Sequence, residues 1–361
     1  MSWTRWLAAA ALAFVMCACG RDPAQVRWDD AFGVAMTQSR TDPRGAEAAF
    51  TRLAAEAPRA VDEGAARREV VRLMLADGRK LEAAELLERI AAEAPREDDR
   101  ARAHYELARL AEDEGDRESA VRLYRSLVLH YPDLMPGERS LAHLLRIARA
   151  AGPAAVDEHL AWTRSISERL AHTGLADDLV FQAADEARVR AESGGDPGDW
   201  ARAEELFQRL AAGPHTPLWN DAVWELSWLY HRQRRFREEV AAILAILRTR
   251  EQLSLFGQDE HPYYYLGQLR LARLQLVELG EPRAAIGSYL RYAELFPRTI
   301  KKDDVRFFAL CAALQAGDQT RADALAALLE REHPDSKYLR RVGPAFADAR
   351  GPHCLPPEVT R

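Results

Sequence analysis

The sequence predicts an all-α protein, a right-handed α-solenoid of stacked helical hairpins. Two observations lead to this fold class. Apolar residues recur with helical periodicity along nearly all of the 361 residues, and no segment of useful length alternates as a strand would. A group of four residues also recurs at fixed steps of 5, 4 and 8 positions. A fixed repeat builds one hairpin per copy and presents a binding surface rather than a catalytic cleft.

Four copies of this group are strict, and each position has a physical role. The leading glycine suits a left-handed turn between two helices, and the alanine lets the second helix approach the first. The residue four positions later fills the space between hairpins, and the proline ends the second helix. The copies are Gly78, Ala83, Leu87, Pro95; Gly115, Ala120, Tyr124, Pro132; Gly280, Ala285, Tyr289, Pro297; and Gly317, Ala322, Ala326, Pro334.

Weaker copies of the group precede the strict copies and lie between them. They begin at Thr41, Gly198 and Arg235, and the Arg235 copy keeps only the apolar positions Val240 and Leu244. The segment 137–172 is predicted to be a degenerate hairpin, because Asp157 stands in the alanine position counted from Gly152.

The helical pattern predicts eight hairpins in sequence. The paired helices are expected at 28–39 and 44–56, 63–76 and 80–93, 99–114 and 117–130, 138–151 and 154–171, 175–192 and 200–212, 218–233 and 235–247, 262–279 and 282–296, and 303–316 and 320–333. We expect an N-terminal block over 28–172, a C-terminal block over 173–342 and an extended tail over 343–361. An irregular loop at 249–262 is a candidate binding or hinge segment, with neutral insertion as the alternative.

The Gly115 copy carries the fullest pattern, because Leu107 and Ala108 precede it in the first helix. In this it resembles the tetratricopeptide repeat family, and the resemblance extends roughly over 29–341. His104 and Ala111 stand where that family prefers Trp and Tyr, and the copies recur every 37 residues rather than about every 34. The resemblance implies a protein-binding array whose groove is lined by the first helix of each hairpin.

Register carried over from the Gly115 copy gives the groove residues that this resemblance implies. They are Arg68, Arg72, Arg102, Tyr105, Arg109, Arg188 and Arg270. Arginine binds carboxylates bidentately, so such a groove would hold an acidic segment or a C-terminal carboxylate. Because 46 of the 50 basic residues are arginine, coincidence is the alternative.

Three consecutive tyrosines at 263–265 add a second candidate contact. They cannot all face inward on a helix, so at least one is expected to be exposed, and exposed tyrosines are common in interfaces. Tyr264 is the residue chosen as the candidate.

The N-terminus predicts export. Arg5 precedes an apolar run that is too short to span a membrane and ends in cysteine. Residues 1–18 resemble a bacterial lipoprotein signal, which implies lipidation of Cys19 and a lipidated tether over 19–27. Met16 departs from the preferred Leu, Cys17 is a rival acceptor, and an ordinary cleaved signal is the alternative. Gly20 rather than Asp after the acceptor favours the periplasmic face of the outer membrane.

The composition of the chain limits the classes of partner that it is expected to bind. The net charge of −6 argues against general nucleic-acid binding, which needs a basic face. Cys311 and Cys354 could form a disulfide in an oxidising compartment, with a buried free thiol at Cys311 as the alternative.

No catalytic or metal-binding motif occurs in the sequence, so we expect no enzyme activity, cofactor or metal. The predicted function is a non-enzymatic scaffold for other proteins in a cell-envelope complex. The chain resembles repeat proteins of outer-membrane β-barrel assembly and of the Tol–Pal system, neither closely. The alternative is an accessory protein that binds a glycan or a small molecule in its groove.

Overall fold

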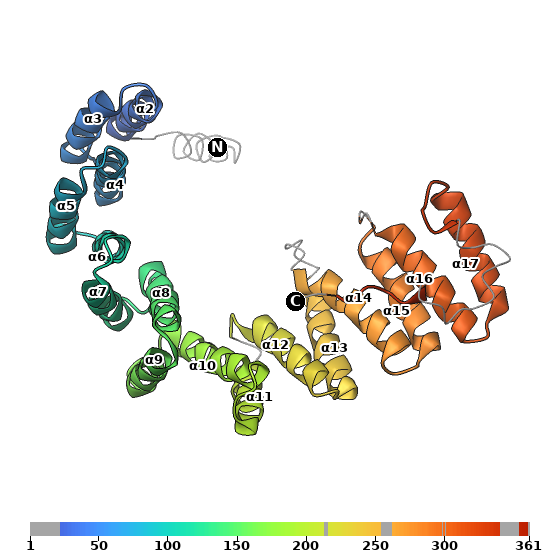
Figure 1. The fold of residues 1–361 in the computed structure, drawn as a ribbon. Helices are drawn as coiled ribbons and strands as arrows, with labels where there is room; N and C mark the ends of the chain where they lie inside the picture. The colour runs from blue at the N-terminus through green and yellow to red at the C-terminus, as the bar shows by residue number, and fades with distance from the viewer. Residues whose placement is uncertain are drawn as a thin grey trace, which may run out of the picture. The chain divides into compact units, whose positions relative to one another are not determined.

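The structure is a computed structural model that describes residues 22–212, 216–253, 262–297, 299, 301–339 and 354–359. In these ranges the regular elements are α-helices, sixteen of them longer than twelve residues, and none is a strand (Figure 1). The predicted all-α array of hairpins is therefore confirmed. The chain divides into two compact units, Met1–Ala176 and Asp177–Arg361, and the sequence placed the division between residues 172 and 173.

Within unit 1, each helix packs mainly against the next one along the chain. Its helices are α2 (Pro23–Gln38), α3 (Pro43–Ala55), α4 (Ala60–Ala76), α5 (Lys80–Glu93), α6 (Glu97–Asp113), α7 (Arg117–His130), α8 (Met135–Ala151) and α9 (Pro153–Ile166). Helix α2 begins inside the predicted tether, because the Asp22 carboxylate accepts the Ala24 N–H at 2.9 Å and Pro23 suits a first helical position.

Unit 2 continues the same arrangement. Its helices are α10 (Leu175–Glu192), which begins just before the division, α11 (Pro197–Ala211), α12 (Trp219–Arg232), α13 (Phe236–Leu253), α14 (Pro262–Val277), α15 (Pro282–Leu295), α16 (Lys302–Gln315) and α17 (Gln319–Glu332). Helix α13 runs to Leu253, so the irregular loop predicted from residue 249 begins later than expected. Residues 254–261 of that loop lie outside the described residues.

The leading glycines of the strict copies adopt the predicted left-handed backbone. Their φ angles are 77° at Gly78, 80° at Gly115, 62° at Gly280 and 70° at Gly317. The alanine and the larger residue that follow are buried in most copies; Ala120 and Tyr124, for example, are both fully inaccessible. Burying side chains of this size stabilises each hairpin by about 1.5–3 kcal/mol per large residue.

The copy assigned to Arg235 is shifted by one residue. Arg234, with φ of 57°, takes the left-handed position two residues before α13, as the glycines of the strict copies do before their helices. Counting from Arg234 puts Glu239 in the alanine position and Ile243 in the aromatic position, and both are fully buried. Val240 and Leu244, which the sequence placed there, are only half-buried. The copy therefore holds a carboxylate where the others hold a methyl group.

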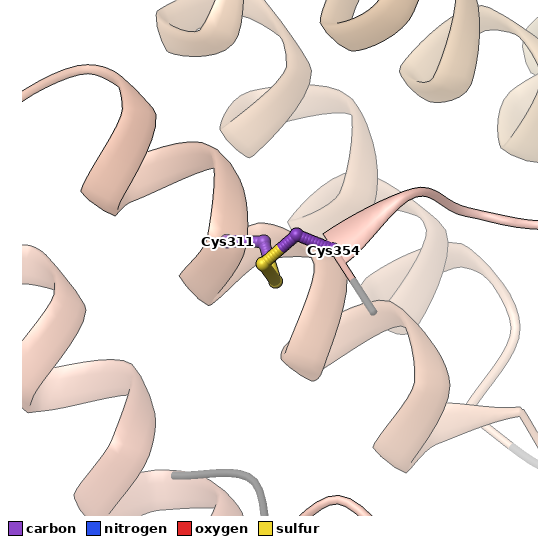
Figure 2. Close-up of a disulfide and its surroundings, with 2 residues drawn as sticks. All are labelled: Cys311 and Cys354. Atoms are coloured by element: carbon purple, nitrogen blue, oxygen red, sulfur yellow. A yellow bond between two sulfur atoms is a disulfide. The ribbon is translucent and has the colours of Figure 1, made fainter. Parts of the chain in front are cut away.

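The end of the chain packs against the last hairpins. Cys311 lies in α16 and is bonded to Cys354, with the two Cα atoms 5.6 Å apart (Figure 2). Both cysteines are at most 1% exposed. Pro356, two residues further on, is also buried, so residues 354–359 form part of the packed structure of unit 2.

Candidate functional site

A groove of about 310 Å³ lies between α4 and α6 in unit 1. Four of the predicted arginines line it, namely Arg68, Arg72, Arg102 and Arg109. Its apolar wall is formed by Val71, Leu75, Ile90 and Ala103, and two carboxylates, Asp99 and Glu106, also line it. The groove therefore combines an apolar surface with four arginines and two carboxylates.

Helix geometry explains why these arginines converge. Arg68 and Arg72 are one turn apart in α4, and Arg102 and Arg109 are two turns apart in α6, so each pair shares a helix face. Their side chains are half-exposed, between 41% and 50%. The guanidinium groups can therefore reach both solvent and a bound segment.

Three of these arginines pair with a carboxylate on their own helix. Arg72 Nε lies 2.7 Å from Glu69 Oε2, Arg102 Nε lies 2.9 Å from Asp98 Oδ2, and Arg109 Nη1 lies 3.5 Å from Glu106 Oε2. Exposed pairs of this kind contribute only about 0–1 kcal/mol each. A carboxylate brought by a partner can therefore replace them at little cost.

Arg68 differs from the other three because its partner is buried. Arg68 Nη1 donates to Asp99 Oδ1 at 2.6 Å, and the Asp99 side chain is 3% exposed. A Cβ on Gly64 would lie 2.3 Å from this carboxylate, so only glycine at position 64 leaves room for it. Arg68 thus ties α4 to α6 and shapes the groove.

Tyr105 does not line the groove. Its side chain is buried, and its hydroxyl lies 2.9 Å from His143 Nε2 in α8. The neighbouring Tyr124 donates to Glu112 Oε2 at 3.0 Å. Burial raises the pKa of both tyrosines. The expected partner contact at Tyr105 is wrong, because this ring joins α6 to α8 inside the unit.

Arg188 in unit 2 is also an interior residue. It is 6% exposed, its Nη2 donates to Asp185 Oδ1 at 2.6 Å, and its Nη1 donates to Glu192 Oε2 at 2.6 Å. Its Nε lies 3.4 Å from Glu225 on α12. The carboxylates that surround it occupy the guanidinium, so the predicted role in partner binding is wrong.

Arg270 is the most deeply enclosed arginine of the predicted set. It is 4% exposed, donates from Nε to Glu239 at 2.7 Å and lies 3.6 Å from the Trp228 ring centroid. Burial lowers its pKa, and the Glu239 carboxylate opposes that shift. The predicted groove contact is wrong, because Arg270 neutralises the carboxylate in the shifted copy. This pair could have been found in the sequence by counting the repeat positions from Arg234 instead of Arg235, which places Glu239 in the alanine position.

The tyrosine triplet turns inward rather than outward. Tyr264 is 4% exposed, and Tyr263 and Tyr265 are half-buried. Tyr263 stacks on Trp224 with ring centroids 4.8 Å apart and donates to Asp221 at 2.8 Å. The predicted exposed contact at Tyr264 is wrong, because α14 packs against α13 on one side and α15 on the other.

The remaining predictions concern the anchor and metals. Cys19, the predicted lipidation site, lies outside the described residues. Across the described ranges, no three His, Cys, Asp or Glu side chains gather as a metal site would require. In the same ranges, none of the helices combines the length and apolar character needed to cross a bilayer.

Comparison with known proteins supports a repeat protein. Residues 102–134, which include most of the groove's α6 wall, match the family described as "Tetratricopeptide repeat". No curated protein matches the chain.

The chain is also similar to solved structures, including those of the following three proteins. PilW, a type IV pilus biogenesis factor, is 15% identical over 67% of this chain and 97% of its own, with a TM-score of 0.37. A repeat protein from Cytophaga hutchinsonii is 14% identical over 86% of this chain and 98% of its own, with a TM-score of 0.36. A signal-transduction ATPase from Pyrococcus horikoshii is 14% identical over 85% of this chain and 46% of its own, with a TM-score of 0.43. At these identities the similarity does not extend to partners, and the family match is confined to residues 102–134.

Proposed function

We propose that the chain is a non-enzymatic scaffold that binds an acidic peptide segment of a partner protein in the arginine-lined groove of unit 1. The convergence of Arg68, Arg72, Arg102 and Arg109 on one groove carries this proposal. Proteins with tetratricopeptide repeats generally act by binding other proteins, which supports the class of partner.

The wall of the groove defines the chemistry of the segment. Val71, Leu75 and Ile90 offer an apolar surface, so the segment needs apolar side chains as well as carboxylates. Guanidinium groups recognise carboxylates through paired N–H donors, which favours Asp, Glu or a free C-terminus. No aromatic ring is among the described lining residues, which favours a peptide over a glycan.

Charge reversal in the groove tests this binding. We would measure fluorescence anisotropy of acidic, neutral and basic amphipathic peptides with the wild type and with Arg72→Glu/Arg109→Glu. The wild type should bind acidic peptides in preference to neutral and basic ones. The variant should bind acidic peptides about 10-fold or more weakly than the wild type does, because charge-assisted hydrogen bonds contribute about 1.5–3 kcal/mol. Higher salt should weaken the wild-type complex.

The matched control is Arg117→Glu/Arg122→Glu. It makes the same charge change on exposed residues of α7, away from the groove, and Arg122 pairs with Glu118 as Arg109 pairs with Glu106. Its affinity should stay within about two-fold of the wild type. Equal losses in both variants, or a preference for basic peptides, would contradict the proposal.

We also propose that a lipid on Cys19 anchors the protein to the periplasmic face of the outer membrane, where it serves a cell-envelope complex. The apolar run before Cys19 and the small Ala18 support this address. Cys19→Ala should move the protein from the membrane fraction to the soluble periplasmic fraction, and Cys17→Ala should not. Membrane retention of Cys19→Ala would refute the anchor.

A further inference from the structure

A second cavity, of about 160 Å³, lies in unit 2 among α14, α15, α16 and residues 356–359. Leu266, Leu269, Phe308 and Pro356 supply much of its apolar surface. Charged groups of both signs also line it: Arg273, Lys301, Asp304 and Glu358. An apolar cavity of similar size in another protein holds benzene, so a molecule of about that size fits here.

Two hydrogen-bond donors at this cavity are buried without an acceptor. Tyr289 is 2% exposed, and among the described residues its hydroxyl has no hydrogen-bond partner. The Nε of Arg273 is likewise buried and unpaired within the described ranges, although its Nη1 donates to Glu278 at 3.3 Å. A buried donor without an acceptor costs about 1–3 kcal/mol, so a ligand that accepts from either group gains correspondingly.

The chain itself shows what satisfies a tyrosine in this position. Tyr124 occupies the same place in the Gly115 copy as Tyr289 occupies in the Gly280 copy. The hydroxyl of Tyr124 donates to the carboxylate of Glu112 at 3.0 Å and lies 3.2 Å from His143 Nδ1. Counted from the two glycines, Val277 replaces Glu112 and Phe308 replaces His143. Unit 2 has therefore kept the tyrosine and lost both of its polar partners.

We propose that this cavity binds a small carboxylic acid, whose carboxylate accepts hydrogen bonds from Tyr289 and Arg273 while its apolar body packs on Leu266, Leu269 and Phe308. The carboxylate takes the role that Glu112 plays in unit 1. Residues 356–359 close one side of the site, and the Cys311–Cys354 bond fixes the start of that segment. The site is independent of the arginine groove and of the peptide proposed to bind there.

Titration with three monosubstituted benzenes tests the proposal. Benzoate, benzamide and toluene would be titrated into the full chain and followed by NMR shifts of leucine methyl groups and by calorimetry. Benzoate should bind at least about 10-fold more tightly than benzamide or toluene, because a hydrogen bond to an ionised acceptor is the stronger kind. Equally tight binding of benzamide or toluene would overturn the claim that the ligand needs a carboxylate. A failure of benzoate to bind would overturn the claim that the cavity is a binding site.

Two substitutions test the geometry. Tyr289→Phe should weaken benzoate about 10-fold while leaving toluene unchanged, and Leu269→Trp should abolish binding of both by filling the cavity. The matched control is Tyr292→Phe, one turn away in the same helix, whose hydroxyl contacts Thr299 outside the cavity. Thermal unfolding would verify that each variant is folded. Unchanged benzoate affinity in Tyr289→Phe would overturn the proposal.

Discussion

At the scale of single residues, the burial of an arginine side chain determines whether it can contact a partner or stabilises the fold. Arg109 is half-exposed beside Glu106, whereas Arg270 is 4% exposed and bonded to the fully buried Glu239. The sequence predicted that both would line the groove. Removing one partner of a buried pair leaves an uncompensated charge in the interior, while an exposed pair loses little.

We therefore predict that Arg270→Leu lowers the free energy of unfolding of unit 2 by about 3–5 kcal/mol, whereas Arg109→Leu changes that of unit 1 by less than about 1 kcal/mol. The double variant Glu239→Ala/Arg270→Leu should recover much of the loss, because it removes the buried carboxylate that has lost its arginine and places there the alanine of the other copies. Urea denaturation checks the series. A double variant no more stable than Arg270→Leu would contradict this account.

Asp62, near the start of α4, should make the free energy of unfolding depend on pH. Arg59 donates to both of its oxygens at 2.8 Å, and these hydrogen bonds hold the pKa of Asp62 below its ordinary value of 3.8. The folded state therefore binds this proton less readily than the unfolded state. The resulting stabilisation is fully present above about pH 5 and is lost as the pH falls through the lowered pKa.

Asp62→Asn should accordingly be less stable than the wild type by about 1 kcal/mol at pH 7, a small value because Arg59 is 59% exposed. Denaturation at pH 7 and at about pH 2.5 would measure the difference, which should shrink at the lower pH. A difference that persists in acid would exclude the carboxylate as its source.

At the scale of elements, the start of the second helix fixes which residues are buried. In the strict copies the left-handed glycine stands at a constant distance from that helix, so counting from it identified the buried alanine. In the copy assigned to Arg235, Arg234 takes the left-handed position, so counting from Arg235 failed by one residue. Gly152 lies directly before Pro153, so the buried residue there is Val156 rather than Asp157.

Two glycines allow a direct test of this turn. Gly115 has a φ of 80°, and no atom lies within 4 Å of a Cβ built on it, so Gly115→Ala changes only backbone strain. We predict a loss of about 1–2 kcal/mol in stability. Gly287, inside α15, also has open space around its Cβ, and Gly287→Ala should stabilise by about 0.5–1 kcal/mol. Thermal denaturation should show a lower melting temperature for Gly115→Ala and a higher one for Gly287→Ala. Shifts of the same sign in both variants would contradict this account of the turn.

The candidate groove shows how far the sequence could predict the site. Arg68, Arg72, Arg102 and Arg109 were found because the spacing within one helix determines their common face. Arg270 was misassigned because its partner Glu239 comes from another helix, α13. Arg188 was misassigned because Glu225 of α12 adds to the two carboxylates on its own helix. Helical periodicity carries no information on such contacts between elements. The fold itself was predictable, since each hairpin repeats a local pattern.

At the scale of the whole molecule, two units with separate internal packing predict two unfolding transitions. Among the described residues, only unit 2 contains a disulfide, and that bond spans 43 positions. A cross-link of this span stabilises by about 2–4 kcal/mol, chiefly through the unfolded chain.

Cys311→Ser/Cys354→Ser should therefore lower the transition of unit 2 by about 2–4 kcal/mol and leave that of unit 1 in place. Calorimetry with and without reductant measures both transitions. A uniform shift of the two, or reductant sensitivity of the double variant, would show that the bond does not act on unit 2 alone.

The position of this bond also has a consequence for biosynthesis. Residue 311 is translated 43 residues before residue 354, so the Cys311 thiol has to remain reduced until its partner has been synthesised. The bond therefore closes only after nearly the whole chain has been made, and a product that ended after α17 would lack Cys354 and keep the Cys311 thiol.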